Sequence, residues 1–133
     1  MDTSHILLVE DNEGDILLTT EALEETGLEL KLTVLKDGEK AIDYLSKLGK
    51  DMASDLPDLI ILDINLPKKN GHEVLQFIKR DGNLKHIPVI IFTSSSSEKE
   101  MKLCRDNFAN TYVTKPSDVS DFMKVVGEMV KVS

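Results

Sequence analysis

The chain has little cysteine, an excess of acidic over basic residues and no long hydrophobic run. Cys104 is its single cysteine, which excludes an intrachain disulfide and favours a reducing compartment. The 16 lysines and arginines stand against 24 aspartates and glutamates, and this net charge of −8 argues against electrostatic binding of nucleic acid or anionic lipid. The N-terminus lacks basic residues, and the apolar run at residues 6–9 is too short for a signal peptide or a membrane span. We therefore expect one small cytoplasmic domain over residues 1–133.

The apolar residues are grouped in short runs that predict a parallel sheet. Residues 6–9, 59–62 and 89–92 are apolar without alternation, which is typical of strands buried on both faces. Residues 30–34 alternate as a half-exposed edge strand should, and residues 111–114 form a weaker fifth strand.

Segments with helical spacing lie between these strands. Apolar residues recur at helical intervals over 122–130 and 74–78. They recur more loosely at Met101, Cys104 and Phe108, where we interpret Cys104 as a buried small hydrophobic residue. Five strands alternating with five helices predict an open, doubly wound α/β domain with right-handed crossovers. The edge-like second strand favours the order 2-1-3-4-5.

Polar side chains follow four of the predicted strands. Glu10 and Asp11 follow the first strand, Asp63 the third, Thr93 the fourth and Lys115 the fifth. Ligands of open α/β sheets bind outside the carboxyl ends of the strands, so the topology brings these side chains to one edge. The combination, in this chain order, predicts a functional site there.

Three carboxylates at one edge need neutralisation. Either a pKa rises or a cation binds, and two carboxylates with waters and a substrate phosphoryl group suit Mg²⁺. Asp63 could carry a phosphoryl group as an acyl phosphate. Thr93 and Lys115 could then contact two of the phosphoryl oxygens.

Four motifs at these strand ends resemble those of the receiver domains of two-component response regulators. They are Val9-Glu10-Asp11, Leu62-Asp63-Ile64-Asn65-Leu66-Pro67 followed by Asn70-Gly71, Phe92-Thr93-Ser94, and Thr114-Lys115-Pro116. The resemblance covers about residues 5–131 and implies the flavodoxin-like fold, whose strand order is the one favoured above.

The resemblance implies a role for each acidic position. Asp63 would accept a phosphoryl group from the phosphohistidine of a sensor histidine kinase. Asp11 and Asp63 would bind Mg²⁺ through their side chains, and Asn65 would bind it through its backbone carbonyl. Glu10 would hold a metal-bound water, at a position where the family more often has aspartate. The Asn65 side chain would tune the lifetime of the phosphoryl group.

The resemblance also implies a switch. Thr93 would move toward the phosphoryl group, and Tyr112 would turn inward with it. Lys115 would stabilise the acyl phosphate, and its bond to Pro116 is expected to be cis. Ser95, two residues after Thr93, would tune the phosphoryl lifetime together with Asn65.

The first two motifs further resemble stand-alone regulators that partner bacterial phytochrome kinases. This resemblance implies a receiver without an output domain, whose phosphorylation changes a surface read by a downstream protein or a phosphorelay partner. The protein would not be an enzyme beyond its own phosphorylation and dephosphorylation. The sequence leaves open whether the outer edge of the last helix pairs with a second subunit.

The remaining polar features have simpler explanations. Ser94 to Ser97 lack the glycines of a P-loop, and a turn followed by a capping box from Ser97 to Glu100 accounts for them. His5, His72 and His86 show no metal-ligand spacing and are interpreted as surface residues.

Two other functions stay open. A small aspartate-dependent phosphohydrolase would use Asp63, Thr93 and Lys115 in a similar layout. Its general-acid aspartate would be expected where Asn65 stands, and a substrate-covering cap is missing. The second of these functions is that of a receiver scaffold, which binds its partner without phosphorylation.

Overall fold

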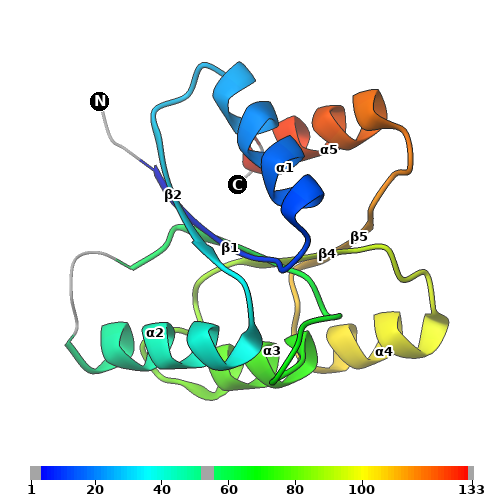
Figure 1. Cartoon of the computed structure of the whole chain (residues 1–133). Helices are drawn as coiled ribbons and strands as arrows, with labels where there is room; N and C mark the ends of the chain where they lie inside the picture. The colour runs from blue at the N-terminus through cyan, green and yellow to red at the C-terminus, as the bar shows by residue number, and fades with distance from the viewer. Residues whose placement is uncertain (1–3, 52–55, 132–133) are drawn as a thin grey trace.

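The computed structural model describes residues 4–51 and 56–131, which form a central sheet flanked by helices on both faces (Figure 1). In chain order the elements are β1 (Ser4–Val9), α1 (Glu13–Glu25), β2 (Leu30–Leu35), α2 (Gly38–Asp51), β3 (Leu59–Leu62), α3 (Gly71–Arg80), β4 (Val89–Thr93), α4 (Glu98–Asp106), β5 (Thr111–Thr114) and α5 (Val119–Lys131). Within these residues each helix is too short or too polar to cross a membrane.

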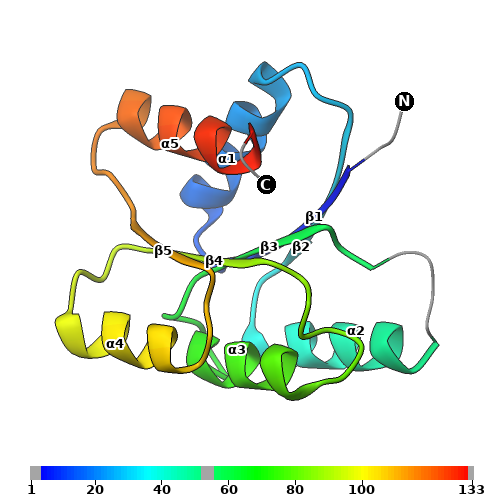
Figure 2. The same cartoon turned by 180° about the vertical axis from the view of Figure 1, so that it is seen from behind.

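The sheet has the predicted topology. Its strands are all parallel, and their order is β2-β1-β3-β4-β5. Helices α1 and α5 cover one face, and α2, α3 and α4 cover the other (Figures 1 and 2). Because Val9 pairs with Leu62 and Thr93 pairs with Thr114, the carboxyl ends of the strands lie in register along one edge.

The three central strands are buried on both faces, as their unbroken apolar runs predict. Every residue of β3 and β4 is buried, and in β1 only Ser4 is exposed. Their side chains divide between two apolar clusters, one under α2, α3 and α4 and the other under α1 and α5. This double packing holds the strand ends in fixed positions.

The alternation predicted for the edge strand β2 is largely absent from its burial. Lys31 is exposed, but the other residues of β2 are all partly buried. Helices α1 and α2 contact β2 from opposite faces, so both sets of side chains are partly covered. β2 is therefore an edge strand that is nevertheless partly covered on both faces.

The helices follow their predicted apolar faces, with one correction in α4. Cys104 is fully buried, but Phe108 lies beyond the end of the helix and is 75% exposed. The backbone N–H groups of Phe108 and Ala109 donate to the carbonyls of Arg105 and Cys104, and Phe108 has a positive φ of 67°. This left-handed cap closes the helix and turns the Phe108 ring away from the core.

The predicted capping box of α4 forms only in part. The Ser97 hydroxyl accepts a hydrogen bond from the Glu100 backbone N–H at 3.4 Å. The Glu100 carboxylate does not return to Ser97, because it pairs with the His72 ring at the start of α3. Glu100 therefore connects α4 to α3.

Candidate functional site

The predicted site residues meet at the carboxyl edge of the sheet. The ends of β1 and β3 bring three carboxylates together, since oxygens of Glu10, Asp11 and Asp63 all lie within 4.8 Å of one another. Glu10 and Asp63 are 2% and 5% exposed, whereas Asp11 is exposed. A cluster of hard oxygen donors with one member open to solvent fits a divalent cation such as Mg²⁺.

Lys115 supplies positive charge to this cluster from the end of β5. Its Nζ lies 2.6 Å from Glu10 Oε1, 2.8 Å from Asp15 Oδ2 and 2.9 Å from Asp63 Oδ2. An ammonium has three N–H donors, so these contacts use its whole donor capacity. The side chain is only 7% exposed, and water screens the contacts little.

Burial and the neighbouring charges have opposite effects on the pKa values of Glu10 and Lys115. Burial raises the pKa of Glu10 to about 7, although the hydrogen bond from Lys115 opposes that rise. Burial would lower the pKa of Lys115, but its hydrogen bonds to Asp15, Glu10 and Asp63 outweigh this effect and raise it. Lys115 therefore stays charged at neutral pH, while Glu10 holds its negative charge less firmly.

Asp15 is a site residue that the strand-end pattern missed. It lies in the first turn of α1, where its backbone N–H donates to the N-cap side chain of Asn12 at 2.9 Å. Its contact with Lys115 depends on how α1 crosses the sheet edge, which no spacing in the sequence indicates.

The loop after β3 wraps around the Asp63 side chain. The Asn65 backbone N–H donates to Asp63 Oδ1 at 3.0 Å, and the Asn65 side chain points to solvent. The Gly71 N–H donates to the carbonyl of Ile64, and a Cβ on Gly71 would lie 2.3 Å from the carbonyl oxygen of Asp63. Gly71 is therefore required for this tight turn.

A second glycine braces the same loop from another part of the chain. The N–H of Gly38, at the start of α2, donates to the carbonyl of Pro67 at 3.3 Å. A Cβ on Gly38 would lie 1.6 Å from the carbonyl oxygen of Lys69, so the two backbones can approach only at glycine.

Thr93 ends β4 and is fully buried. Its hydroxyl accepts a hydrogen bond from the Ser95 N–H at 3.4 Å, and its carbonyl accepts one from the Lys115 N–H at 2.7 Å. Thr93 thus links the loop at 94–97 to the strand end that carries Lys115.

Tyr112 contacts the same loop from β5. Its hydroxyl donates to the Ser95 carbonyl at 2.8 Å, and burial raises the pKa of its partly buried phenol. The motion implied for Tyr112 and Thr93 stays a prediction, but both side chains contact Ser95 from separate strands.

The expectation of a cis bond between Lys115 and Pro116 is wrong for this structure, in which the bond is trans. The trans form is intrinsically favoured even before proline. The Lys115 N–H bond to Thr93 and the Lys115 side-chain contacts are made with the trans bond.

The interpretation of the histidines as surface residues is correct only for His86, which is exposed. His5 is 5% exposed because β1 is an inner strand covered by helices, and its Nε2 lies 2.8 Å from Thr33 Oγ1. His72 is partly covered between α3 and α4, with Nδ1 3.8 Å from Cys104 Sγ.

Cys104 fits its prediction as a structural residue. It is fully buried, and burial together with the Glu100 charge raises the pKa of the thiol to about 11. A thiol with so high a pKa is a poor nucleophile, which disfavours a redox role.

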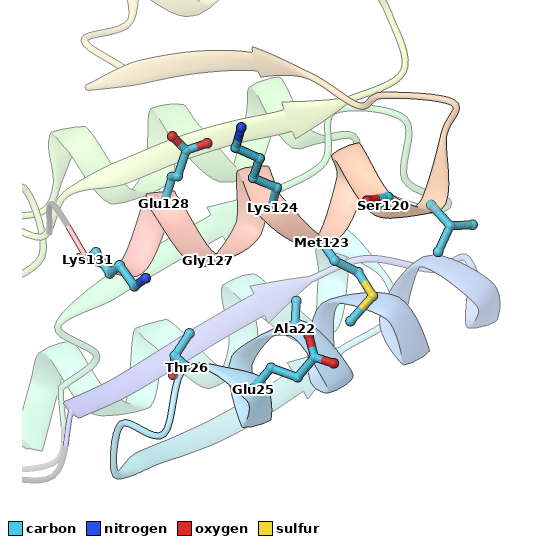
Figure 3. A pocket seen from close by; sticks show the side chains of 10 residues that line it. Ala22, Glu25, Thr26, Ser120, Met123, Lys124, Gly127, Glu128 and Lys131 are labelled. Atoms are coloured by element: carbon cyan, nitrogen blue, oxygen red, sulfur yellow. The ribbon is translucent and has the colours of Figure 1, made fainter.

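A surface groove of about 800 Å³ lies elsewhere, between α1 and α5 (Figure 3). Ala22 and Glu25 line it on α1, and Met123, Lys124 and Glu128 line it on α5. None of the strand-end residues Glu10, Asp11, Asp63, Thr93 and Lys115 lines this groove, so it is separate from the acidic site.

These features define the class of the protein. It is a doubly wound α/β domain whose carboxyl edge combines a cluster of three carboxylates with a buried lysine and a buried threonine. The chain belongs to the response regulator receiver domain family, whose model matches residues 6–127. The resemblance inferred from the four motifs is thus confirmed.

Individual relatives agree with this assignment. The probable methanogenesis regulatory protein FilR2 of Methanothrix harundinacea is 40% identical over 124 residues, which cover 93% of this chain and 79% of FilR2. The crystal structure of the phosphorylated cyanobacterial phytochrome response regulator RcpA has a TM-score of 0.91 at 38% identity, covering 98% of this chain and 93% of RcpA.

A second solved structure bears on the acidic cluster. The Mn²⁺-bound form of the response regulator Rcp1 has a TM-score of 0.87 at 39% identity, covering 95% of this chain and 91% of the Rcp1 chain. The acidic cluster of this chain has the donor types that such a hard divalent cation prefers.

Proposed function

We propose that this receiver accepts a phosphoryl group on Asp63 from the phosphohistidine of a sensor histidine kinase, in a reaction that depends on Mg²⁺. The observation that carries the proposal is the contact of Lys115 Nζ with Asp63 Oδ2 at 2.9 Å, inside a carboxylate cluster whose oxygens lie within 4.8 Å of one another. A nucleophilic carboxylate and a cation for the arriving charge are thus adjacent.

In the reaction a carboxylate oxygen of Asp63 attacks phosphorus, and the bond from phosphorus to the kinase histidine nitrogen breaks. The electron pair of that bond stays on the imidazole, and the product on this chain is an acyl phosphate. The Asn65 N–H, 3.0 Å from Asp63 Oδ1, orients the carboxylate so that the other oxygen can react. Lys115 is already close enough to donate to a phosphoryl oxygen.

The metal would be held by Asp11, by Asp63, by the Asn65 backbone carbonyl and through water by Glu10. When bound, it neutralises charge on the phosphoryl oxygens in the transition state. Without a cation, the four carboxylates of Glu10, Asp11, Asp15 and Asp63 outnumber the one ammonium, which disfavours the approach of an anionic phosphodonor.

The phosphoryl group would act by biasing the loop at 94–97 and the surface beside it. Thr93 and Tyr112 both contact Ser95, so a movement of the Thr93 hydroxyl toward a new acceptor would disturb the Tyr112 bond as well. A downstream protein or a phosphorelay partner would read the changed face of α4, β5 and α5.

The identity to the phytochrome response regulator RcpA, 38% over 98% of this chain, supports a phytochrome kinase as the phosphodonor. Incubation with an autophosphorylated phytochrome kinase should transfer label to wild-type protein and not to Asp63→Asn. Transfer from unrelated kinases at an equal rate would contradict the phytochrome assignment.

The central test is incubation with acetyl phosphate and Mg²⁺, followed by intact-mass measurement. We expect the gain of one phosphoryl group, which is lost in Asp63→Asn and in EDTA. Asp58→Asn is a matched control, because Asp58 is an exposed aspartate before β3 and should not affect labelling. Labelling of Asp63→Asn at the wild-type level would refute the assignment.

The same samples separate the alternative functions. Repeated turnover of small phosphate esters would favour a phosphohydrolase, whereas stoichiometric labelling without turnover supports the receiver. Binding of a partner with equal affinity before and after labelling would favour a scaffold. Size exclusion with and without a phosphoryl mimic tests pairing of two chains through α5, and an unchanged monomer would remove that suggestion.

A further inference from the structure

The carboxylate of Asp15 is the third partner of the Lys115 ammonium, and it is the only one of the three outside the predicted cation-binding cluster. Asp15 Oδ2 lies 2.8 Å from Lys115 Nζ, while the cluster consists of Glu10, Asp11 and Asp63. The Asp15 side chain is 27% exposed, compared with 3% for Glu10 and 7% for Asp63.

A divalent cation and the ammonium compete for the same oxygens. Lys115 Nζ lies 2.6 Å from Glu10 Oε1 and 2.9 Å from Asp63 Oδ2, and both carboxylates belong to the cation-binding cluster. A cation bound there repels the ammonium and takes up part of the charge that holds it. The contacts of Lys115 with Glu10 and Asp63 must therefore weaken when the metal binds.

The displaced ammonium has little access to water. The Lys115 side chain is 7% exposed, and an unpaired buried ammonium is strongly disfavoured. Asp15 can keep it paired, because its carboxylate lies 2.8 Å from the ammonium and outside the cluster that the cation would occupy. The backbone N–H bond of Asp15 to Asn12 Oδ1 fixes the position of this first turn.

We propose that Asp15 is a positioning residue that keeps the Lys115 ammonium paired when a divalent cation takes up the charge of Glu10 and Asp63. The proposal rests on the metal-dependent function proposed above. In the metal-free protein the ammonium has three carboxylate partners, whereas in the metal-bound protein Asp15 is its main partner. Asp15 thus contributes more to the metal-bound form and raises the affinity for the cation.

The test is the affinity for Mn²⁺ measured by electron paramagnetic resonance, with no phosphodonor present. Asp15→Asn should bind Mn²⁺ roughly tenfold more weakly than wild type, the factor that corresponds to one charge-assisted hydrogen bond. Glu13→Gln is the matched control, because it removes one negative charge from the same helical turn. Glu13 is 73% exposed and pairs with Lys36, so its loss should weaken binding less than about threefold.

A second measurement separates positioning from a general charge effect. In a Lys115→Met background there is no ammonium to keep paired, so Asp15→Asn should weaken Mn²⁺ binding no more than Glu13→Gln does. Asp15→Glu, which retains the charge, should restore most of the affinity. Circular dichroism spectra and unfolding midpoints establish that each variant is folded.

Three results would overturn the proposal: equal effects of Asp15→Asn and Glu13→Gln, tighter binding by Asp15→Asn, or an undiminished effect of Asp15→Asn in the Lys115→Met background. Because Mn²⁺ binding needs no phosphoryl transfer, these results are independent of labelling by acetyl phosphate. Failure of labelling would refute the proposed function and leave the Mn²⁺ measurements able to decide the role of Asp15.

Discussion

Replacement of Lys115 by methionine would remove the ammonium from the acidic edge and leave a side chain of similar length. The change breaks three charge-assisted hydrogen bonds, of 2.6, 2.8 and 2.9 Å, made by a side chain that is 7% exposed. Removal of one partner from a buried ion pair costs about 3–5 kcal/mol, because the remaining charge is left uncompensated.

The lower end of this range applies at neutral pH. The pKa of Glu10 is already raised to about 7, so Glu10 can take up a proton once Lys115 is absent. Asp15, at 27% exposure, can turn to water. We therefore expect Lys115→Met to lower the free energy of unfolding by about 3 kcal/mol at pH 7 in EDTA.

Magnesium should reverse most of this loss. A divalent cation in the cluster of Glu10, Asp11 and Asp63 would supply the missing positive charge. At saturating Mg²⁺ the difference between Lys115→Met and wild type should shrink to roughly 1 kcal/mol. The assay is urea unfolding followed by far-ultraviolet circular dichroism, with and without Mg²⁺.

Lys102→Met is the matched control for this experiment. Lys102 also pairs with an aspartate, Asp106, at 2.7 Å, but the two side chains are 68% and 54% exposed. Its loss should leave the free energy of unfolding close to that of the wild type, with or without Mg²⁺. An equal loss of stability in Lys115→Met with and without Mg²⁺ would refute the view that the ammonium and the metal neutralise the same carboxylates.

Two further predictions concern the loop brace and the pH dependence. Gly38→Ala should lower the free energy of unfolding by about 3 kcal/mol in urea titrations, since its Cβ would meet a backbone oxygen at 1.6 Å. Gly82→Ala, with nothing within 4 Å of its Cβ, should change it by less than about 1 kcal/mol, and equal losses would contradict the clash. In EDTA, stability should fall as the pH rises from 4.5 toward 7, because the folded protein keeps a proton on Glu10 that the unfolded chain has lost. Glu10→Gln should lose about 2 kcal/mol less over this window in the same titrations, and parallel pH profiles would count against the raised pKa.

The fold was predictable because its determinants are local. Runs such as 59–62 and 89–92 are apolar on both sides because both faces of the sheet are covered, and that pattern is visible without any long-range information. The positions of Asp63, Thr93 and Lys115 followed from the strand ends, since parallel strands expose their carboxyl ends at one edge.

Features that depend on the orientation of one element relative to another were not predictable in this way. Asp15 reaches Lys115 because of how α1 crosses the sheet edge, and the helical pattern carries no sign of that contact. In the sequence His5 is a polar residue just before an apolar run, but the residue is buried because β1 is an inner strand of the sheet. Phe108 continues the apolar spacing of α4, but the helix closes before it.

The hydrogen bond from the Tyr112 hydroxyl to the Ser95 carbonyl has a practical consequence for spectroscopy. The chain has no tryptophan and two tyrosines, so tyrosine dominates its near-ultraviolet absorbance. The absorbance of a phenol shifts when its hydroxyl exchanges a protein carbonyl for water. Tyr44 lies on α2, at the opposite end of the helical layer from the loop between β4 and α4 (Figure 1), and serves as an internal reference. A Tyr44→Phe variant would thus carry a single tyrosine, which reports on the Ser95 loop without an attached dye.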